Sequence, residues 1–518
     1  MKAMLFIDLE VQYLYMSTIV TWQRYMLILM IFFLPFTHFS ISFPLIGDAP
    51  YLLFLLIGYI LFIFECLILG KSLSEWEKLG CIFLCIMVIW KIVTGVIGII
   101  DYQYFGQINL TQMDNFKNLY DNVSSHFSLN EEFAIKSWLI YKAVRSAFLN
   151  VAYSYLISFW IYHIYEDNWQ IAIHDLKKIT VILCGALSLY SVFEVNYLIG
   201  GGIGKSLLAT INPLYMTIAD IHNWWPPLFW DGQVRSLFAE PSFFGIYTAM
   251  AIPILLSFFF DSKITFKSFI GIAVYVFIVT MLVLSKARSG TVLFCIEFLM
   301  AIIWTFVYQR KYWKRLVFVG ICTCLAFFMG LGILTQFKSH RDANRGSVSV
   351  ESYVSQNVAS VVGNKRSNSA RFANVYATVM VGLQNPLIGV GPGLKDVYLD
   401  KNLQQEDRLI PEVANWSNMM YENGPLKSSY PTLNHLAGVF AEEGVLGLII
   451  FIVPIFGTIL AAIKYRKCFF NTGDMFLLIS FIGLCCAFFS NTATVEFYIM
   501  MGFMALISKK NKEINDGK

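Results

Sequence analysis

Runs of about twenty consecutive apolar residues recur along the whole chain. A helix of that length crosses the roughly 30 Å hydrocarbon core of a bilayer. Hydrophobic residues make up 57% of the chain and charged residues only 14%, whereas soluble domains carry about 25% charged residues. A water-soluble fold cannot bury this much apolar surface, and the short alternating segments of a membrane β-barrel are absent. The sequence therefore predicts an all-α polytopic membrane protein.

Hydropathy predicts about twelve transmembrane helices. Their approximate ranges are 25–46, 50–70, 79–100, 141–165, 179–199, 243–260, 268–285, 290–308, 316–335, 442–463, 475–491 and 496–508. Lys and Arg gather in every second connecting segment, as is typical of short cytoplasmic loops. These residues are Lys71, Lys78, Lys177, Lys178, Lys263, Lys267, Arg310, Lys311, Lys314, Arg315, Lys464, Arg466 and Lys467, followed by Lys509, Lys510 and Lys512 in the tail. The alternation predicts that both termini are cytoplasmic.

This topology divides the chain into three parts. Residues 1–335 contain helices one to nine, with shorter outer loops at about 101–140 and 200–242; residues 336–441 form the longest outer loop; and residues 442–518 contain helices ten to twelve and a cytoplasmic tail. An outer loop of roughly a hundred residues exceeds the usual connection length, and such loops are usually functional or disordered. Apolar residues between Arg371 and Leu383 repeat at helical spacing, which predicts an amphipathic helix at the membrane surface.

Two short segments at predicted helix ends carry cations. Arg235 and Glu240 precede Gly245 where the second outer loop enters a helix, an arrangement that suits either ordinary interface anchoring or the binding of an anionic head group. Lys286 and Arg288 lie in a very short outer turn, where the topology rule expects few basic residues. Because guanidinium groups bind phosphate bidentately, Arg288 is a candidate phosphate ligand; the alternative is that it bonds carbonyl groups at helix ends.

Two further segments lie within and after the longest loop. Arg371 and Gly382 are eleven residues apart, about three helical turns, so they share one helix face on which the small residue lets a bulky partner approach. From Asn434 to Gly447, a spacing of seven puts His435 and Glu442 on one face. A histidine at the water–lipid boundary can act as a general base oriented by a carboxylate, although a single interfacial histidine is more often structural.

In their order and topology, these segments resemble the O-antigen polymerase and ligase superfamily of the Wzy type across roughly residues 230–450. The matching pieces are Arg235–Gly245, the Ser-Lys-Ala-Arg-Ser-Gly turn at 285–290, Arg371 with Gly382, the run Asn385–Gly391, and Asn434–Gly447. The resemblance implies a glycosyltransferase-type polymerase that joins undecaprenyl-diphosphate-linked repeat units of O-antigen, capsule or exopolysaccharide. It implies action at the periplasmic face of the bacterial inner membrane, and it allows a chain-length regulator as a partner.

The residue types agree with this chemistry. The departing diphosphate develops negative charge, which Arg235, Arg288 and Arg371 are expected to stabilise, with Lys286 and Asn434 as further binding residues.

The acceptor hydroxyl needs a general base, for which His435, Glu240 and Glu442 are the candidates in that order. The outer segments carry no acidic pair with evident Mg²⁺ geometry, so we expect metal-independent transfer without a cofactor. The small net charge of +4 argues against a nucleic-acid partner.

Other functions remain open. A ligase that moves finished glycan to lipid A or to a protein would use similar parts. A secondary transporter shares the plan of twelve helices with both termini inside, and the intramembrane charges Glu65, Lys91, Glu194 and Glu297 are the kind that mark ion paths. The off-centre position of the long loop and the lack of an internal repeat weigh against a transporter. A non-enzymatic flippase or assembly partner is the third alternative.

Overall fold

A computed structural model describes residues 18–42, 47–128, 130–216, 232–261, 265–337, 366–428, 430–469 and 473–515. Within these ranges every secondary-structure element is a helix, which confirms the predicted all-α class. Among the described residues, seven helices are long and apolar enough to cross a membrane. They are α3 (Glu75–Ile100), α7 (Trp169–Leu198), α9 (Pro241–Leu256, continued by a 3₁₀ turn to Phe260), α10 (Phe266–Ser285), α11 (Arg288–Tyr308), α12 (Trp313–Leu334) and α17 (His435–Lys464).

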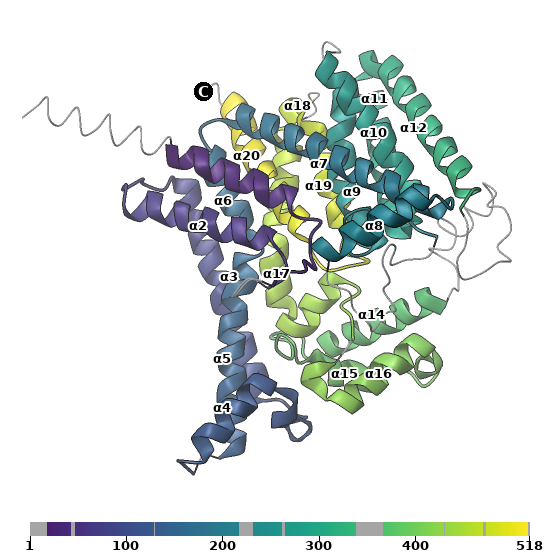
Figure 1. The fold of residues 1–518 in the computed structure, drawn as a ribbon. Coiled ribbons are helices and arrows are strands. Elements are labelled where there is room, and N and C mark those ends of the chain that lie inside the picture. The colour runs from purple at the N-terminus through teal and green to yellow at the C-terminus, as the bar shows by residue number, and fades with distance from the viewer. Residues whose placement is uncertain are drawn as a thin grey trace, which may run out of the picture.

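Other helices complete the bundle. The apolar ones are Thr18–Phe32, α2 (Tyr51–Leu67) and α19 (Asp474–Ala487), and they are joined by α6 (Tyr155–Tyr165), α8 (Gly202–Tyr215), α18 (Arg466–Phe469) and α20 (Val495–Asn515). α9 lies at the centre, almost wholly buried, and packs against α7, α10, α11 and α19. The molecule is therefore a polytopic helical bundle built around α9 (Figure 1).

Two predicted spans are wrong. The helix predicted at 25–46 is Thr18–Phe32, so it ends at Phe32. The other is wrong in its continuity. The sequence predicts a single helix at 141–165, whereas α5 (Glu131–Ala152) ends before Tyr153 and α6 begins at Tyr155. Ser154 between them has φ of −129° and ψ of −113°, outside the helical region. α5 packs along α3, and these two helices, with α4 (Asp114–Ser124) across their ends, project away from the bundle (Figure 1).

The connecting segments gather on two opposite faces. Ion pairs join the segments predicted to be cytoplasmic; they are Arg24–Asp175 (2.8 Å), Lys177–Asp261 (3.6 Å), Lys509–Glu166 (3.1 Å) and Lys510–Asp474 (2.9 Å). The other face carries α4, α14 (Arg366–Gln384), α15 (Lys395–Asn402) and α16 (Pro411–Asn423), as Figure 1 shows. We call it the loop face. The two-sided arrangement is that of a multi-pass membrane protein, and the orientation of its termini stays a prediction.

The loop face has an apolar core of its own, separate from that of the bundle. It joins the end of α3 and the start of α5 to α14, α15 and α16. Asp400 ties these pieces together by accepting hydrogen bonds from Ser417 (2.6 Å), Tyr430 (2.7 Å) and Tyr421 (2.8 Å) and by pairing with Arg408 (3.1 Å). The described part of the long loop is thus packed and helical, while its residues 338–365 lie outside the described ranges.

α14 confirms the helix predicted between Arg371 and Leu383. Its large apolar residues point outward, since Phe372 and Leu383 are exposed, whereas the small residues Ala373 and Ala377 are buried against the rest of the loop face. Small residues allow close helix packing, which explains why they form the buried side. The exposed apolar side is the one that would meet the membrane surface, as the sequence predicts.

Candidate active site

The first two cationic segments pack against each other. The backbone N–H of Val234 donates to the carbonyl oxygen of Leu284 (3.3 Å). Gly245 on α9 faces Gly290 on α11, and a Cβ added to Gly290 would lie 2.6 Å from the Cα of Gly245. This contact is closer than side chains allow, so glycine at both positions lets the two helices touch. The segment that begins at Arg235 and the 285–290 turn therefore form one unit.

The last two segments form a second unit. Gly382 on α14 packs against the ring of Phe440 on α17, the bulky partner that the small residue was predicted to admit. Beyond α14, the N–H groups of Val390 and Gly391 donate to the carbonyl oxygens of Ala441 (2.9 Å) and Glu442 (3.0 Å). The run that follows Asn385 is therefore held against the start of α17 by backbone hydrogen bonds.

α17 folds back on itself at Gly444. Its φ of +69° and ψ of −170° are not helical. The ring of His435 lies 4.7 Å from that of Phe451, although sixteen residues of continuous helix would separate them by about 24 Å. The segment from His435 to Glu443 is thus a short helix packed beside α14, and the membrane helix proper begins after Gly444.

An arginine pair lies where the two units meet. Arg288 donates to the side-chain oxygen of Asn368 (3.3 Å), and Arg371 donates to the carbonyl oxygen of Ser490 (3.0 Å). Partial desolvation and the positive charge of Arg288 lower the pKa of Arg371, while Glu240 acts in the opposite direction. Three of the predicted site residues, from segments far apart in sequence, therefore lie within electrostatic reach of one another.

Glu240 and Lys286 flank this pair at helix ends. Glu240 precedes the first turn of α9 and accepts a hydrogen bond from the hydroxyl of Ser242 (3.0 Å). Lys286 ends α10 in the left-handed backbone conformation, with φ of 52°. That conformation makes the chain turn sharply enough for Arg288 to begin α11 two residues later.

His435 and Asn434 occupy the start of α17. The Asn434 side chain caps the helix by accepting from the N–H of Ala437 (3.0 Å). The His435 ring packs against Phe451 and Phe488, and its backbone N–H donates to the carbonyl oxygen of Phe488 (2.9 Å). Both His435 and Arg371 therefore contact the turn that follows α19.

Arg235 lies inside the protein, with no exposed surface. Its guanidinium donates to the carbonyl oxygen of Phe238 (2.5 Å) and to the hydroxyl of Tyr215 (3.3 Å), and its Nε lies 4.0 Å from Glu194. Glu194 also accepts a hydrogen bond from the N–H of Ser236 (2.8 Å). Arg235 and Glu194 together stabilise the segment that leads into α9. In this conformation Arg235 holds the structure beside the site in place through its bonds to Phe238 and Tyr215.

Glu442 lies with a different set of charges. Its carboxylate accepts from Lys395 of α15 (3.0 Å), which also lies 3.5 Å from Asp396. Burial lowers the pKa of Lys395, but Glu442 and Asp396 outweigh it, so the pKa is raised overall. This ion pair fastens α15 to the short helix of α17.

One ion pair that sequence reasoning missed lies beside it. Glu443 bonds Lys91 of α3, and the indole N–H of Trp90 donates to the carbonyl oxygen of Glu443 (3.2 Å). Lys91 stood out as an intramembrane charge, but nothing in the sequence indicates its partner, 352 residues away. The pair attaches α3 to the turn at Gly444.

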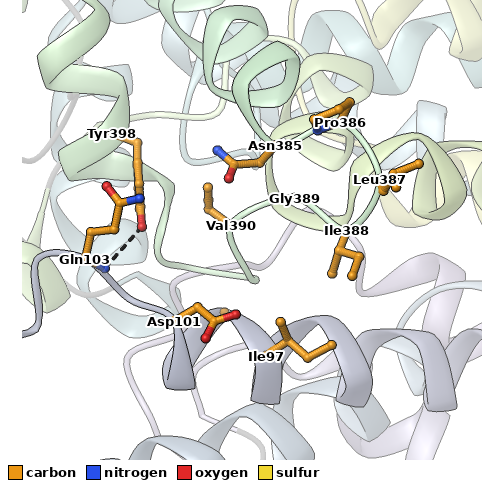
Figure 2. A pocket seen from close by; sticks show the side chains of 11 residues that line it. Ile97, Asp101, Gln103, Asn385, Pro386, Leu387, Ile388, Gly389, Val390 and Tyr398 are labelled. Atoms are coloured by element: carbon orange, nitrogen blue, oxygen red, sulfur yellow. Dashed lines mark hydrogen bonds between the residues drawn. The ribbon is translucent and has the colours of Figure 1, made fainter.

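A pocket opens at the far end of α14 from the arginine pair (Figure 2). It lies between the end of α3 and the run Asn385–Val390, with a volume of about 320 Å³. Asp101, Gln103 and Tyr398 line one end of it. Within the described ranges, no group of three or more His, Cys, Asp or Glu side chains could hold a metal ion.

Comparison with known proteins identifies one domain. The family model of the O-antigen ligase, Wzy_C, matches residues 273–452. The match includes the 285–290 turn, α14 and the short helix of α17, and it begins after the segment around Arg235. Searches of curated proteins and of solved structures find no match. Residues 273–452 of this polytopic membrane protein therefore match the O-antigen ligase domain, in agreement with the resemblance to the O-antigen polymerase and ligase superfamily.

Proposed function

We propose that this protein polymerises oligosaccharide repeat units carried on undecaprenyl diphosphate, at the periplasmic face of the bacterial inner membrane. The product would be an O-antigen, a capsule or an exopolysaccharide. The family supports this proposal because its members transfer glycans, and the helical bundle supplies the membrane setting that a lipid-linked substrate requires.

The observation that carries the proposal is the pairing of Arg288 with Arg371. Two like charges held near each other repel: partial desolvation, the larger cause, and the positive charge of Arg288 both lower the pKa of Arg371, while Glu240 acts against them. A diphosphate between the two guanidinium groups would relieve the repulsion, and it would accept the bidentate hydrogen bonds that guanidinium groups offer. The pair therefore suits a ligand with two or more negative charges.

In the reaction, a hydroxyl oxygen of the acceptor glycan attacks the anomeric carbon of the donor glycan. The new C–O bond forms as the bond from that carbon to the diphosphate oxygen breaks, and the diphosphate leaves with the electron pair. Arg288 and Arg371 stabilise the negative charge that develops on it. Such electrostatic stabilisation by preorganised donors is usually the largest single contribution to catalysis. The acceptor proton passes to a nearby base.

Glu240 is the base that the geometry favours among the three candidates. It lies within electrostatic reach of Arg371, whereas the ring of His435 packs against Phe451 and Phe488, and Glu442 accepts a hydrogen bond from Lys395. Asn434 would act as a helix cap that positions its neighbours. Lys286 and the buried Arg235 would support the site through the chain conformation around it.

A deletion strain complemented with variants tests the proposal. We expect Arg371→Ala to give single repeat units attached to the acceptor, with no ladder of longer chains, at unchanged protein abundance. Arg145→Ala, which removes an exposed arginine of α5, is the matched control and should give a normal ladder.

The same experiment separates the alternatives. Accumulation of lipid-linked polymer in the deletion strain would indicate a ligase that moves finished glycan to lipid A or to a protein. A normal ladder in the deletion strain, together with coupled solute flux by the reconstituted protein, would refute glycan transfer in favour of a transporter. A chain-length regulator as a partner would alter the modal length of the ladder without abolishing it.

A further inference from the structure

The pocket at the end of α14 has walls of two chemical kinds. Its polar groups are one carboxylate, two carboxamides and one phenol, contributed by Asp101, Gln103, Asn385 and Tyr398. Its apolar walls include Ile97 of α3, facing the run that contains Ile388 (Figure 2). No Lys or Arg is among the described residues that line it. A phosphate group therefore finds no cation here.

These walls match a carbohydrate. Carboxylate and carboxamide groups accept and donate the hydrogen bonds that sugar hydroxyls make, while the C–H faces of a sugar ring can lie against apolar side chains. The volume of about 320 Å³ is at the lower end of the roughly 300–1,000 Å³ range of ligand pockets, so one or two sugar units would fill it.

The pocket is built from fixed backbone. Gly389 has φ of +76°, and a side chain there would overlap the carbonyl group of Glu442. Across the pocket, the backbone N–H of Gln103 donates to the hydroxyl of Tyr398 (3.3 Å), which joins the end of α3 to α15. The loop, α3 and α15 are thus fixed to one another before any ligand binds, which lowers the entropic cost of binding.

Its position relates it to the arginine pair. Asn385 follows Arg371 by fourteen residues along α14, or about 21 Å of helix. A glycan whose diphosphate rests on Arg288 and Arg371 and whose chain follows α14 would bring sugars remote from the diphosphate to this pocket.

We infer that this pocket is a glycan-binding subsite that holds sugar units of the repeat remote from the diphosphate, with Asp101 and Gln103 as its specificity-determining hydrogen-bonding residues. This inference rests on the proposed function, since it takes the lipid-linked glycan as the substrate. It assigns α14 a second role, which is to set the distance between the reacting end of the glycan and the sugars that are recognised.

The test is a binding measurement that needs no diphosphate. The probe is the oligosaccharide released by mild acid from the source organism's own lipid-linked repeat units, titrated against the full-length protein in nanodiscs by saturation-transfer NMR. We expect Asp101→Ala to bind the probe at least about tenfold more weakly than the wild type, because it removes a hydrogen bond to a charged group. Asp121→Ala, which removes an exposed carboxylate of α4, should bind like the wild type.

A second variant guards against misfolding. Gln103→Ala keeps the backbone N–H that bonds Tyr398, so it removes only the side chain and should also weaken binding. Wild-type affinity in both variants, or no binding of the probe by the wild-type protein, would overturn the subsite.

A third variant separates this failure from a failure of the proposed function. Arg371→Ala should bind the probe normally and yet make no chains. If it binds normally and still extends chains, the arginine site is wrong while the subsite stands.

Discussion

Replacing Gly444 by alanine tests whether α17 folds back. The φ of +69° and ψ of −170° at this position belong to a region that is essentially restricted to glycine, and holding another residue there costs about 1–3 kcal/mol. The added Cβ would also overlap the carbonyl oxygen of Leu387, and a backbone atom cannot move aside as a flexible side chain can. We therefore expect at least about 2 kcal/mol of destabilisation where the loop face joins the bundle, or roughly a thirtyfold larger population of locally opened molecules.

Hydrogen exchange of the protein in nanodiscs measures that opening. The amides of Val390, Gly391 and Val445, which donate to the carbonyl oxygens of Ala441, Glu442 and Pro386, should exchange faster in Gly444→Ala. The control is Gly457→Ala in the same helix, where a Cβ meets nothing within 4 Å and alanine favours the helix by up to about 1 kcal/mol. If the two variants exchange alike, α17 is a continuous helix and the proposed arrangement of the site is wrong.

Three more outcomes are expected. Glu443→Gln should destabilise the protein by up to about 3–5 kcal/mol, since it leaves the partly buried charge of Lys91 without its partner, and the midpoint of thermal unfolding should fall; an unchanged midpoint would refute the ion pair's structural role. Burial raises the pKa of Asp400, but the hydrogen bonds that its carboxylate accepts outweigh burial, so the pKa is lowered from 3.8 overall. The ionised carboxylate therefore stabilises the fold above pH 3.8, and this stabilisation is lost as the pH falls further. We therefore expect α15 and α16 to open more at pH 3 than at pH 6, as measured by hydrogen exchange. Asp400→Asn should remove this difference between the two pH values. Finally, Glu240→Gln should slow chain extension in vitro by 10²-fold or more if it is the base, whereas a larger loss in His435→Gln would transfer that role to the histidine.

The bundle could be predicted from the sequence because hydropathy depends only on composition along the chain. The division of 141–165 at Ser154 could not, since no Gly or Pro marks the break and the break arises from where α5 and α6 pack. The turn at Gly444 could not be predicted either, because Gly444 lies within the long, largely apolar run that begins at His435. A glycine in such a run indicates a turn only when its partner, here the loop after α14, is known.

The candidate site was predicted in part. The segments that carry Arg288, Arg371 and Glu240 were recognisable, and the structure places Arg288 and Glu240 within electrostatic reach of Arg371. The sequence could not show that Arg235 is buried beside Glu194, because no local pattern links residues on separate helices. α14 was predicted as a helix from the spacing of its large apolar residues, but its buried side is formed by small residues such as Ala373 and Ala377.

The affinity of undecaprenyl diphosphate for the full-length protein tests the central claim most directly. Arg288→Ala and Arg371→Ala should each weaken binding by about tenfold or more, since hydrogen bonds to charged groups contribute about 1.5–3 kcal/mol. Arg371→Lys should recover little of the loss, because an ammonium group cannot bond bidentately, and Arg145→Ala should bind like the wild type. Unchanged affinity in both alanine variants would contradict the assignment of the arginine pair to the diphosphate.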